Sequence, residues 1–290
     1  MDKVMSNKWV IFLYLLPATL MIGVLVYIPI AVSGYFGLFD WDGVGAMNFI
    51  GLQNYTELLT DSTFWFSARN SFYLALFSTL ALVVYLGVAL VLSSKVKGRE
   101  LFRKIYLIPM LLSSVAIAQL WIRVYDPNNG FLNTFLRNIG FDNPPAWLAE
   151  RDTVLFAIFV AIVWQFAGFY IIIYTAALKG ISEELVEAAE IDGASPLQIA
   201  TRIKVPLISG VIKTTVVLAI VGSLKYFDLI WVMTGGGPNG ASEVLASYMY
   251  KEAFNRNNFG YGSAIGFALL ILALLTTVVI QKITKSKESQ

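Results

Sequence analysis

The chain of 290 residues is 57% hydrophobic and only 14% charged, with a mean hydropathy of +0.69. Soluble domains carry about 25% charged and about 45–50% apolar residues, so this composition indicates a membrane protein. The sequence contains no Cys and no His, which excludes disulfide scaffolds, Cys/His zinc sites and His-dependent catalysis, and its net charge of +2 is too small to indicate nucleic-acid binding.

Six largely apolar runs are long enough to cross a bilayer, whose apolar core of about 30 Å requires about 20 helical residues. They predict an all-α membrane protein that forms a single domain over residues 1–290, with spans at about 9–30, 70–94, 105–124, 154–178, 211–233 and 262–281. Pro29 is expected to mark the point where the first helix starts to leave the lipid. The first run is too long for a signal peptide, and no A-x-A-like site closes it, so we expect a retained span rather than a cleaved leader.

The distribution of Lys and Arg predicts the orientation, because cytoplasmic segments carry an excess of basic residues. With the N-terminus inside, 14 of the 21 basic residues are cytoplasmic and seven are not. The 14 are Lys3, Lys8, Lys95, Lys97, Arg99, Arg103, Lys104, Lys179, Arg202, Lys204, Lys213, Lys282, Lys285 and Lys287. Both termini are therefore predicted to be cytoplasmic.

The two longer outer segments carry different signals. Residues 48–69 mix aromatic and aliphatic side chains with few charges. Two interpretations of this segment remain open: an interfacial helix at the outer headgroup level, or a partly buried loop packed on the helices. Residues 125–152 contain Asp-Pro-Asn-Asn-Gly and Pro-Pro sequences, which indicate turns rather than a helix.

The polar stretch 179–213 has the pattern of two short helices on the cytoplasmic side. Ser182 is expected to cap the first helix, whose first turn carries two Glu residues. Gly193 stands where a left-handed helix terminus is needed. Ser195 and the following Pro predict the start of the second helix, which Pro206 is expected to end. An exposed amphipathic element of this kind requires a partner.

This segment resembles the EAA loop of the permeases of ABC importers, the binding-protein-dependent transport system inner membrane components. The resemblance rests on Glu187-Ala188-Ala189-Glu190-Ile191-Asp192-Gly193-Ala194, followed by Ile203 and Pro206. Similarity to the carbohydrate-importer branch extends over most of the chain, including Phe49-Ile50-Gly51-Leu52-Gln53-Asn54-Tyr55, Leu107-Ile108-Pro109 with Trp121, and Thr234-Gly235-Gly236-Gly237-Pro238. The last of these is similar to a motif of the maltose permease F-type subunits. Ala200 and Val205 depart from the family pattern, which usually has Phe and Leu there.

The resemblance implies the type I importer (MetI-like) fold: six transmembrane helices and a cytoplasmic coupling helix in the loop 180–208. It implies a bacterial inner membrane subunit without catalytic residues, metal or cofactor of its own, which moves a mono-, di- or oligosaccharide into the cytoplasm. The implied partners are a second permease in a heterodimer, two copies of an ATPase subunit that bind ATP and Mg²⁺, an extracytoplasmic solute-binding protein and the lipid bilayer. The residues implied to contact the ATPase are Glu187, Ala188, Ala189, Asp192, Gly193, Ile203 and Pro206.

The fourth and fifth spans contain side chains that suit a sugar, which is held by aromatic faces together with hydroxyl and amide groups. Trp164 lies next to this set in the fourth span, and Ser223 and Tyr226 are three residues apart, on one face of the expected fifth helix. Similarity to the F-type permeases adds Phe166 and Gly222. The predicted substrate path consists of Gln165, Phe166, Phe169, Tyr170, Gly222, Ser223 and Tyr226. The same aromatic residues could instead pack helix against helix.

Two further features bear on the class of transporter. Lys225 and Asp228 interrupt the fifth run and could pair within the pathway, or could lie at the outer water boundary. An ion- or proton-coupled secondary carrier is the main alternative, but no other span has an acid near its centre, and no inverted repeat is evident. The Gly-rich sequence 235–242 has Ala241 in place of the essential Lys of an ATP-binding loop, so we do not expect this chain to bind ATP.

Overall fold

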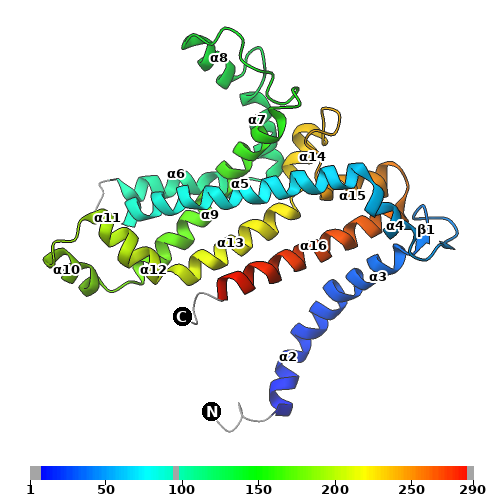
Figure 1. Cartoon of the computed structure of the whole chain (residues 1–290), viewed down its shortest axis with the longest axis horizontal. Coiled ribbons are helices and arrows are strands. Elements are labelled where there is room, and N and C mark those ends of the chain that lie inside the picture. The colour runs from blue at the N-terminus through cyan, green and yellow to red at the C-terminus, as the bar shows by residue number, and fades with distance from the viewer. Residues whose placement is uncertain (1–7, 94–97, 286–290) are drawn as a thin grey trace. The chain divides into compact units, whose positions relative to one another are not determined.

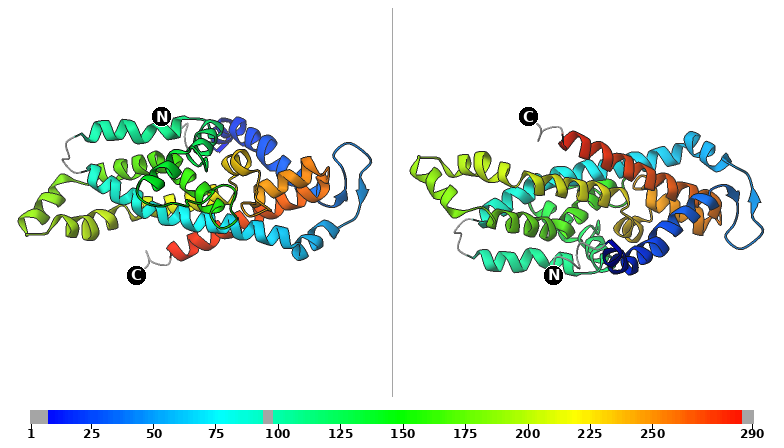
Figure 2. Two further views of the ribbon diagram at one scale, coloured as in Figure 1. Left: turned by 90° about the horizontal axis from the view of Figure 1, so that it is seen from above. Right: turned by 90° about the horizontal axis from the view of Figure 1, so that it is seen from below.

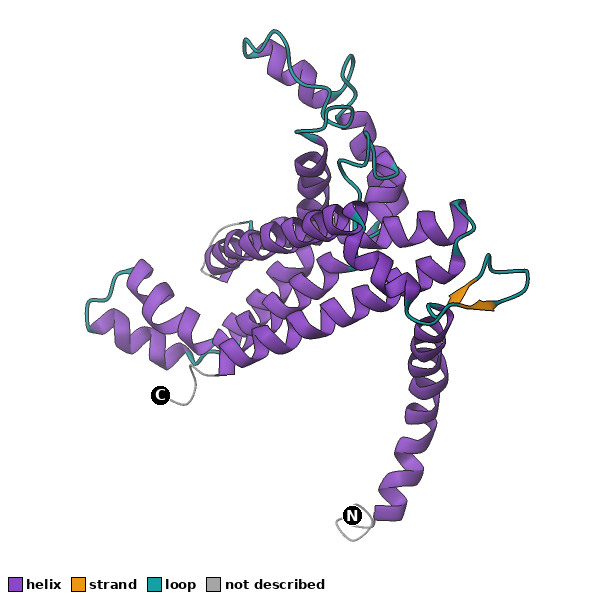
Figure 3. Ribbon diagram, turned by 45° about the vertical axis from the view of Figure 1, so that its right-hand side comes forward, coloured by secondary structure: helices purple, strands orange, loops and turns teal. Residues whose placement is uncertain are grey.

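The computed structural model describes residues 8–93 and 98–285, which are mainly helical (Figures 1 and 3). Lys3, Lys95, Lys97 and Lys287, which contribute to the predicted orientation, lie outside the described residues. The chain forms two compact units, Met1–Phe64 with Tyr248–Ile271 and Trp65–Ser247 with Leu272–Gln290.

Five helical segments among the described residues are long and apolar enough to cross a membrane. They are Lys8–Phe36, Ser62–Ser93, Val154–Lys179, Ser209–Thr234 and Phe259–Lys282. A sixth crossing would consist of the pair Lys104–Leu111 and Ser114–Val124, which is bent by 108°. The fold class is therefore that of a helical membrane protein with five or six candidate spans.

In the first unit, α2 (Lys8–Ile22), the π-helical turn η1 (Gly23–Tyr27) and α3 (Ile28–Phe36) follow one another without a break. Pro29 does not interrupt the helix. The preceding π turn closes with a bond from the Ile28 N–H to the Gly23 carbonyl, and Pro29 then occupies the first turn of α3. A proline is tolerated there because its missing N–H has no partner to lose.

The remainder of the first unit consists of short elements around the ends of two long helices. Strands β1 (Phe39–Asp40) and β2 (Asn48–Phe49) pair antiparallel, and they are followed by α4 (Gln53–Thr60), the start of α5 (Ser62–Ser93), the end of α15 (Leu245–Tyr250), η3 (Lys251–Asn255) and the start of α16 (Phe259–Lys285). Asn54 on α4 is buried, and its Nδ2 donates to the carbonyls of Gly37 and Phe39 at 3.0 and 2.9 Å. These bonds favour the interpretation that α4 packs on its own unit.

The second unit contains the rest of α5 and most of the other helices. These are α6 (Arg99–Leu111), α7 (Ser114–Val124), α8 (Phe131–Asn138), α9 (Val154–Lys179), α10 (Glu183–Ile191), α11 (Pro196–Ile199), η2 (Ala200–Lys204), α12 (Val205–Leu207), α13 (Ser209–Leu224) and α14 (Asp228–Thr234). One buried apolar cluster joins α7, α9 and α14 around Ile117, Ile158 and Leu229. A second joins α5, α9 and α13 around Ala89, Tyr174 and Ala219. Helix α9 thus contributes to both clusters.

Three predicted segments differ from the structure of the second unit. The predicted third span, 105–124, is broken because Leu112 is extended and the Ser113 hydroxyl caps α7 by accepting from the Ala116 N–H at 3.2 Å. The predicted fifth span, 211–233, is interrupted after Leu224. The segment 125–152 contains helix α8 in addition to the turn predicted at Asp126. In that turn, Asp126 Oδ1 accepts hydrogen bonds from the N–H groups of Asn128 and Asn129 at 3.0 and 2.8 Å.

Candidate functional site

A cavity of about 180 Å³ lies between α5, α9 and α13 of the second unit. The structure brings six of the seven residues of the predicted substrate path together at its wall, namely Phe166, Phe169, Tyr170, Gly222, Ser223 and Tyr226. The wall is completed by Ser78, Tyr85, Ile162, Val163, Leu218 and Ala219. Aromatic rings and a few hydroxyl groups therefore face one space, as a sugar would require.

The aromatic side of this cavity is held by stacking and by hydrogen bonds. The rings of Tyr85 and Tyr170 stack at 5.7 Å between centroids and 5° between planes. The Tyr85 hydroxyl donates to the Val163 carbonyl at 2.7 Å, which fixes α5 against α9. Phe166 meets Tyr226 edge to face at 6.0 Å. The wall is thus built from side chains whose orientations are fixed by their neighbours.

Gln165, the seventh predicted residue, does not line the cavity but supports it from behind. It is buried, and its Oε1 accepts a hydrogen bond from the Tyr226 hydroxyl at 2.8 Å. Its Nε2 donates to the Ser114 hydroxyl on α7 at 3.3 Å. Gln165 therefore positions the Tyr226 ring, and the same amide links α9 to α7.

The expected helical relation between Ser223 and Tyr226 is wrong, although both residues line the cavity. Helix α13 ends at Leu224, and Tyr226 lies in the break before α14. The break turns the Tyr226 hydroxyl towards Gln165, which a continuous helix was not expected to do. Interrupted helices are common at substrate sites of membrane transporters because the break exposes polar groups at membrane depth.

Two residues that sequence analysis missed are Ser78 and Tyr85 on α5. They are seven residues apart, so they lie on the same face of the helix. The run that follows Arg69 contains other polar residues as well, so this pair alone is a weak signal of a polar face. Ser114 was also missed, because it contributes only through Gln165.

The structure places three other highlighted residues away from the cavity wall. Trp164 lines a separate apolar groove of about 540 Å³ between α7, α8 and α9, where it meets Trp121 edge to face at 5.8 Å. Lys225 and Asp228 are exposed, and within the described part of the chain no ion pair joins them. The hypothesis that these two charges pair on one helix face is wrong, because they stand on either side of the helix break.

The predicted coupling segment forms a helical hairpin at the end of α9 and the start of α13 (Figure 2). Gly193 has φ +80°, as expected for the residue that ends α10. The N–H of Ala194 reaches back to the Ala189 carbonyl at 2.9 Å, which completes the left-handed terminus. Ser195 and Gln198 form a reciprocal capping box at the start of α11. The turn is therefore fixed by the backbone and by local caps.

The hairpin differs from the prediction at two positions. Ser182 stands at the N-cap of α10, but its side chain makes no capping bond to any residue that the structure describes. Pro206 does not end the second helix; it lies in the first turn of α12, directly after the π-helical turn η2. As at Pro29, the wider turn before the proline accommodates its missing N–H.

The outer surface of the hairpin is both acidic and apolar. All carboxylates of α10 and its C-cap are exposed, and they include Glu187 and Asp192. Ile191 is 86% exposed and Leu197 is 73% exposed, whereas Ile199 is buried. Ala188 and Pro206 are exposed, and Ala189 and Ile203 are half-buried. A surface with this mixture suits a protein partner that offers basic and apolar groups.

The Gly-rich loop after α14 does not offer a phosphate cradle. It follows a helix, not a strand, and some of its N–H groups are used within the loop. The Gly237 N–H bonds to the Thr234 carbonyl at 3.0 Å, and the Ser242 N–H bonds to the Gly236 carbonyl at 3.3 Å. Asn70 on α5 secures the loop by donating to the carbonyls of Ala241 and Glu243. The loop is therefore held by contacts to its own residues and to α5.

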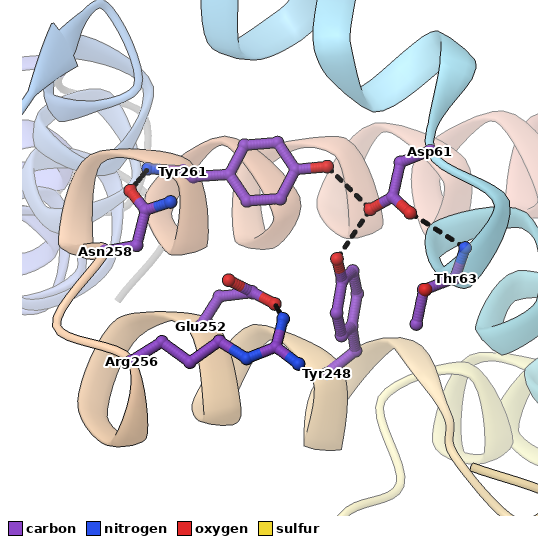
Figure 4. Close-up of polar contacts among 7 residues, drawn as sticks. All are labelled: Asp61, Thr63, Tyr248, Glu252, Arg256, Asn258 and Tyr261. Carbon is purple, nitrogen blue, oxygen red and sulfur yellow. Dashed lines mark hydrogen bonds and ion pairs between the residues drawn. The ribbon is translucent and has the colours of Figure 1, made fainter. Parts of the chain in front are cut away.

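A polar cluster occupies the first unit, where α5 begins (Figure 4). Asp61 Oδ2 accepts hydrogen bonds from the hydroxyls of Tyr248 and Tyr261 at 2.6 and 2.7 Å, and Oδ1 accepts from the Thr63 N–H at 2.8 Å. Partial burial alone would raise the pKa of Asp61, but these bonds and one from the Phe64 N–H outweigh it and lower the pKa. The carboxylate is therefore ionised and joins three segments of the unit.

A second acidic group, Glu252, lies in the same cluster. It is buried and forms an ion pair with Arg256 one helical turn later. Burial raises the pKa of Glu252, and the neighbouring guanidinium opposes that effect. Among the described residues, no group of three potential metal ligands is found. The cluster is thus a structural network of hydrogen bonds.

The sequence matches the family described as binding-protein-dependent transport system inner membrane component over residues 78–287. A probable ABC transporter permease protein of Pyrococcus horikoshii is 39% identical over 271 residues, which cover 92% of this chain and 93% of that protein. The trehalose/maltose transport system permease protein MalF of Thermococcus litoralis is 33% identical, and the match covers 93% and 92% of the two chains.

Among solved structures, a chain of a bacterial alginate ABC transporter, in complex with an alginate pentasaccharide-bound periplasmic protein, has a TM-score of 0.85. The match covers 98% of this chain and 96% of that chain, at 23% identity. A likeness at this level of identity concerns the fold.

Proposed function

Because the chain belongs to the family of binding-protein-dependent transport system inner membrane components, we propose that it is the permease subunit through which an ABC importer carries a sugar into the cytoplasm. It is a multi-pass inner membrane protein with the type I importer fold, and a transport subunit rather than an enzyme. The sugar class is supported by the 33% identity to a trehalose/maltose permease and by the aromatic cavity.

The observation that carries this proposal is the exposed hairpin 180–208. Its acidic and apolar surface has the composition of a docking element, and its sequence matches the EAA pattern. In the proposed assembly, Glu187 and Asp192 pair with basic residues of an ATPase subunit, and Gly193 provides the turn between the two helices. Ala188, Ala189, Ile203 and Pro206 shape the same element.

ATP and Mg²⁺ belong to the ATPase subunits in this proposal. We propose two copies of that subunit, a second permease that forms a heterodimer with this chain, and an extracytoplasmic binding protein that delivers the sugar. The excess of basic residues on one side supports an orientation with both termini in the cytoplasm. The hairpin then faces the cytoplasm, where an ATPase subunit is accessible.

The cavity between α5, α9 and α13 is proposed as part of the sugar path. Tyr85, Phe166, Phe169, Tyr170 and Tyr226 supply ring faces for the apolar faces of a sugar. Ser78 and Ser223 supply hydroxyl groups, and Gly222 leaves room beside them, since no described atom lies within 4 Å of a Cβ added there. Gln165 holds the Tyr226 ring in place.

Uptake by the assembled transporter in proteoliposomes tests the path. Tyr226→Ala and Gln165→Ala should lower sugar uptake or alter sugar preference, while the loaded binding protein still stimulates ATP hydrolysis, because the docking surfaces are unchanged. Trp164→Ala is the matched control: it removes a large ring from the same helix but outside the cavity. If both cavity variants transport every sugar as the parent does, the path lies elsewhere.

The same vesicles separate an importer from a secondary carrier. An ABC importer stops when ATP is withheld, even with an intact proton gradient. Uptake that continues under these conditions would favour an ion- or proton-coupled carrier instead.

A further inference from the structure

Two arginines converge on one aromatic ring where α5 and α9 begin. The Arg69 guanidinium carbon lies 4.5 Å from the centroid of the Phe66 ring, and that of Arg151 lies 5.9 Å from the same centroid. Arg69 also lies 5.8 Å from the Tyr73 ring. All four residues belong to the second unit. Phe66 therefore contacts two positive groups, at the end of these helices opposite to the hairpin 180–208.

These two charges lack carboxylate partners within the part of the chain that the structure describes. No ion pair there includes Arg69 or Arg151. Glu150, next to Arg151 in sequence, directs its Oε1 to the Ala146 N–H at 2.7 Å. Asp152 is exposed and forms no ion pair with Arg151. Two guanidinium groups against one ring repel each other, and a bound anion offsets that cost.

The surroundings indicate that this anion belongs to a membrane lipid. Side chains beside and below Arg69 on α5 form an exposed stripe at helical spacing: Phe72, Tyr73, Leu76, Leu80 and Val83. The stripe begins with two aromatic residues, which favour the interface between headgroups and acyl chains. From Arg69 the helix continues without a charged residue to Ser93, so the guanidinium marks the headgroup level at this end of the span.

We propose that Arg69 and Arg151 form a binding site for the phosphate of an anionic phospholipid, with an acyl chain along the exposed stripe of α5. The planar guanidinium groups bind phosphate oxygens through paired N–H donors, which a lysine does not offer. The apolar stripe distinguishes this site from one for free phosphate or for an acidic loop of a protein, neither of which would use it.

Native mass spectrometry of the purified full transporter tests the site by counting retained lipids. Phosphatidylglycerol is the probe, phosphatidylcholine is the zwitterionic control, and inorganic phosphate at matched concentration tests the free anion. Arg69→Gln with Arg151→Gln should weaken retention of phosphatidylglycerol by about tenfold or more, with little change for phosphatidylcholine. Arg123→Gln, at the end of α7, is the matched loss of an arginine outside the pair.

Two further variants keep the test informative if the double variant assembles poorly. Arg69→Lys with Arg151→Lys keeps both charges but removes the paired donors, so it should retain an intermediate amount of phosphatidylglycerol. Phe66→Leu keeps both arginines but removes the ring that orients them, and should also weaken retention. Equal retention by the parent and all these variants would overturn the proposal. Full displacement of the lipid by inorganic phosphate would also overturn it. So would variants in which the only change is a higher concentration of binding protein needed to stimulate ATP hydrolysis.

Discussion

Gly193 offers a substitution whose effect depends on backbone conformation alone. Its φ of +80° lies in the left-handed region, and no described atom lies within 4 Å of a Cβ built on it. A larger side chain therefore meets no steric obstacle outside its own backbone. The cost of Gly193→Ala is about 1 kcal/mol, and that of the β-branched Gly193→Val is higher, about 2–3 kcal/mol. Asn tolerates this conformation best among residues with a side chain.

If the turn must keep this shape to engage the ATPase, the cost lowers the population of competent hairpins. A penalty of about 2 kcal/mol corresponds to a reduction of about thirtyfold. We expect sugar uptake to be lowered least by Gly193→Asn, more by Gly193→Ala and most by Gly193→Val. The amount of ATPase that co-purifies should fall in the same order. Expression and membrane insertion should stay near the parental level, since the residue is exposed and far from both buried clusters.

The assay is uptake and ATP hydrolysis by the assembled transporter, with Gly210→Ala and Gly210→Val as matched controls. Gly210 lies in α13 at negative φ, and it also has no described atom within 4 Å of an added Cβ. These controls add the same side chains without left-handed strain and should transport normally. Normal uptake by Gly193→Val would remove the coupling role of the turn, and equal losses in the Asn and Val variants would refute the conformational explanation.

Three other experiments test separate parts of the structure. Because the chain has no native Cys, single Cys at Asn129 should react with an impermeant thiol reagent from outside and Cys at Ser195 should not; the reverse pattern would contradict the orientation. Asp61→Asn should destabilise the fold by about 1–2 kcal/mol, reduced by the partial exposure of the carboxylate. Because folding lowers the pKa of Asp61, the stabilisation by its carboxylate is present above about pH 4 and is lost as the pH falls through the folded-state pKa. The Asp61→Asn variant should lack this acid-dependent loss. A melting profile of the parent protein that does not change from pH 7 to pH 3 would contradict this expectation. Tyr174→Phe removes a 2.6 Å bond to Thr215 and should lower uptake per ATP hydrolysed by about fivefold, corresponding to about 1 kcal/mol, whereas a parental ratio would show that this bond is dispensable.

Local signals were sufficient for the hairpin 180–208, because its shape is determined by neighbouring residues. Gly193 at positive φ and the cap formed by Ser195 both follow from short-range rules. Six residues of the cavity wall were also predicted from the sequence, since few helix faces combine aromatic and hydroxyl side chains. Ser78 and Tyr85 escaped notice because two polar residues in a long apolar run carry little weight until the neighbouring helices are known.

The break at Leu112 and the small helix α8 were missed for different reasons. Leu112 becomes extended between two helical runs without a Gly or Pro at that position, so mean hydropathy treats both runs as one span. Helix α8 is secured by the buried Asn133, which donates to the carbonyls of Pro127 and Pro145 and accepts from the Trp147 indole. These partners are up to 14 residues away. The turn signals on either side of α8 therefore led to a prediction of turns without a helix.

The chain order of the second unit suggests why the hairpin and the cavity can influence each other. Helix α9 carries Phe166 and Tyr170 on the cavity wall and then leads directly into α10. The chain returns through α13, which carries Gly222 and Ser223 on the opposite wall. The bond from Tyr174 to Thr215 joins these two helices between the hairpin and the cavity, and both residues are buried. A rigid displacement of the hairpin would therefore move both walls together, and helices packed in this way transmit a shift as a body rather than by bending.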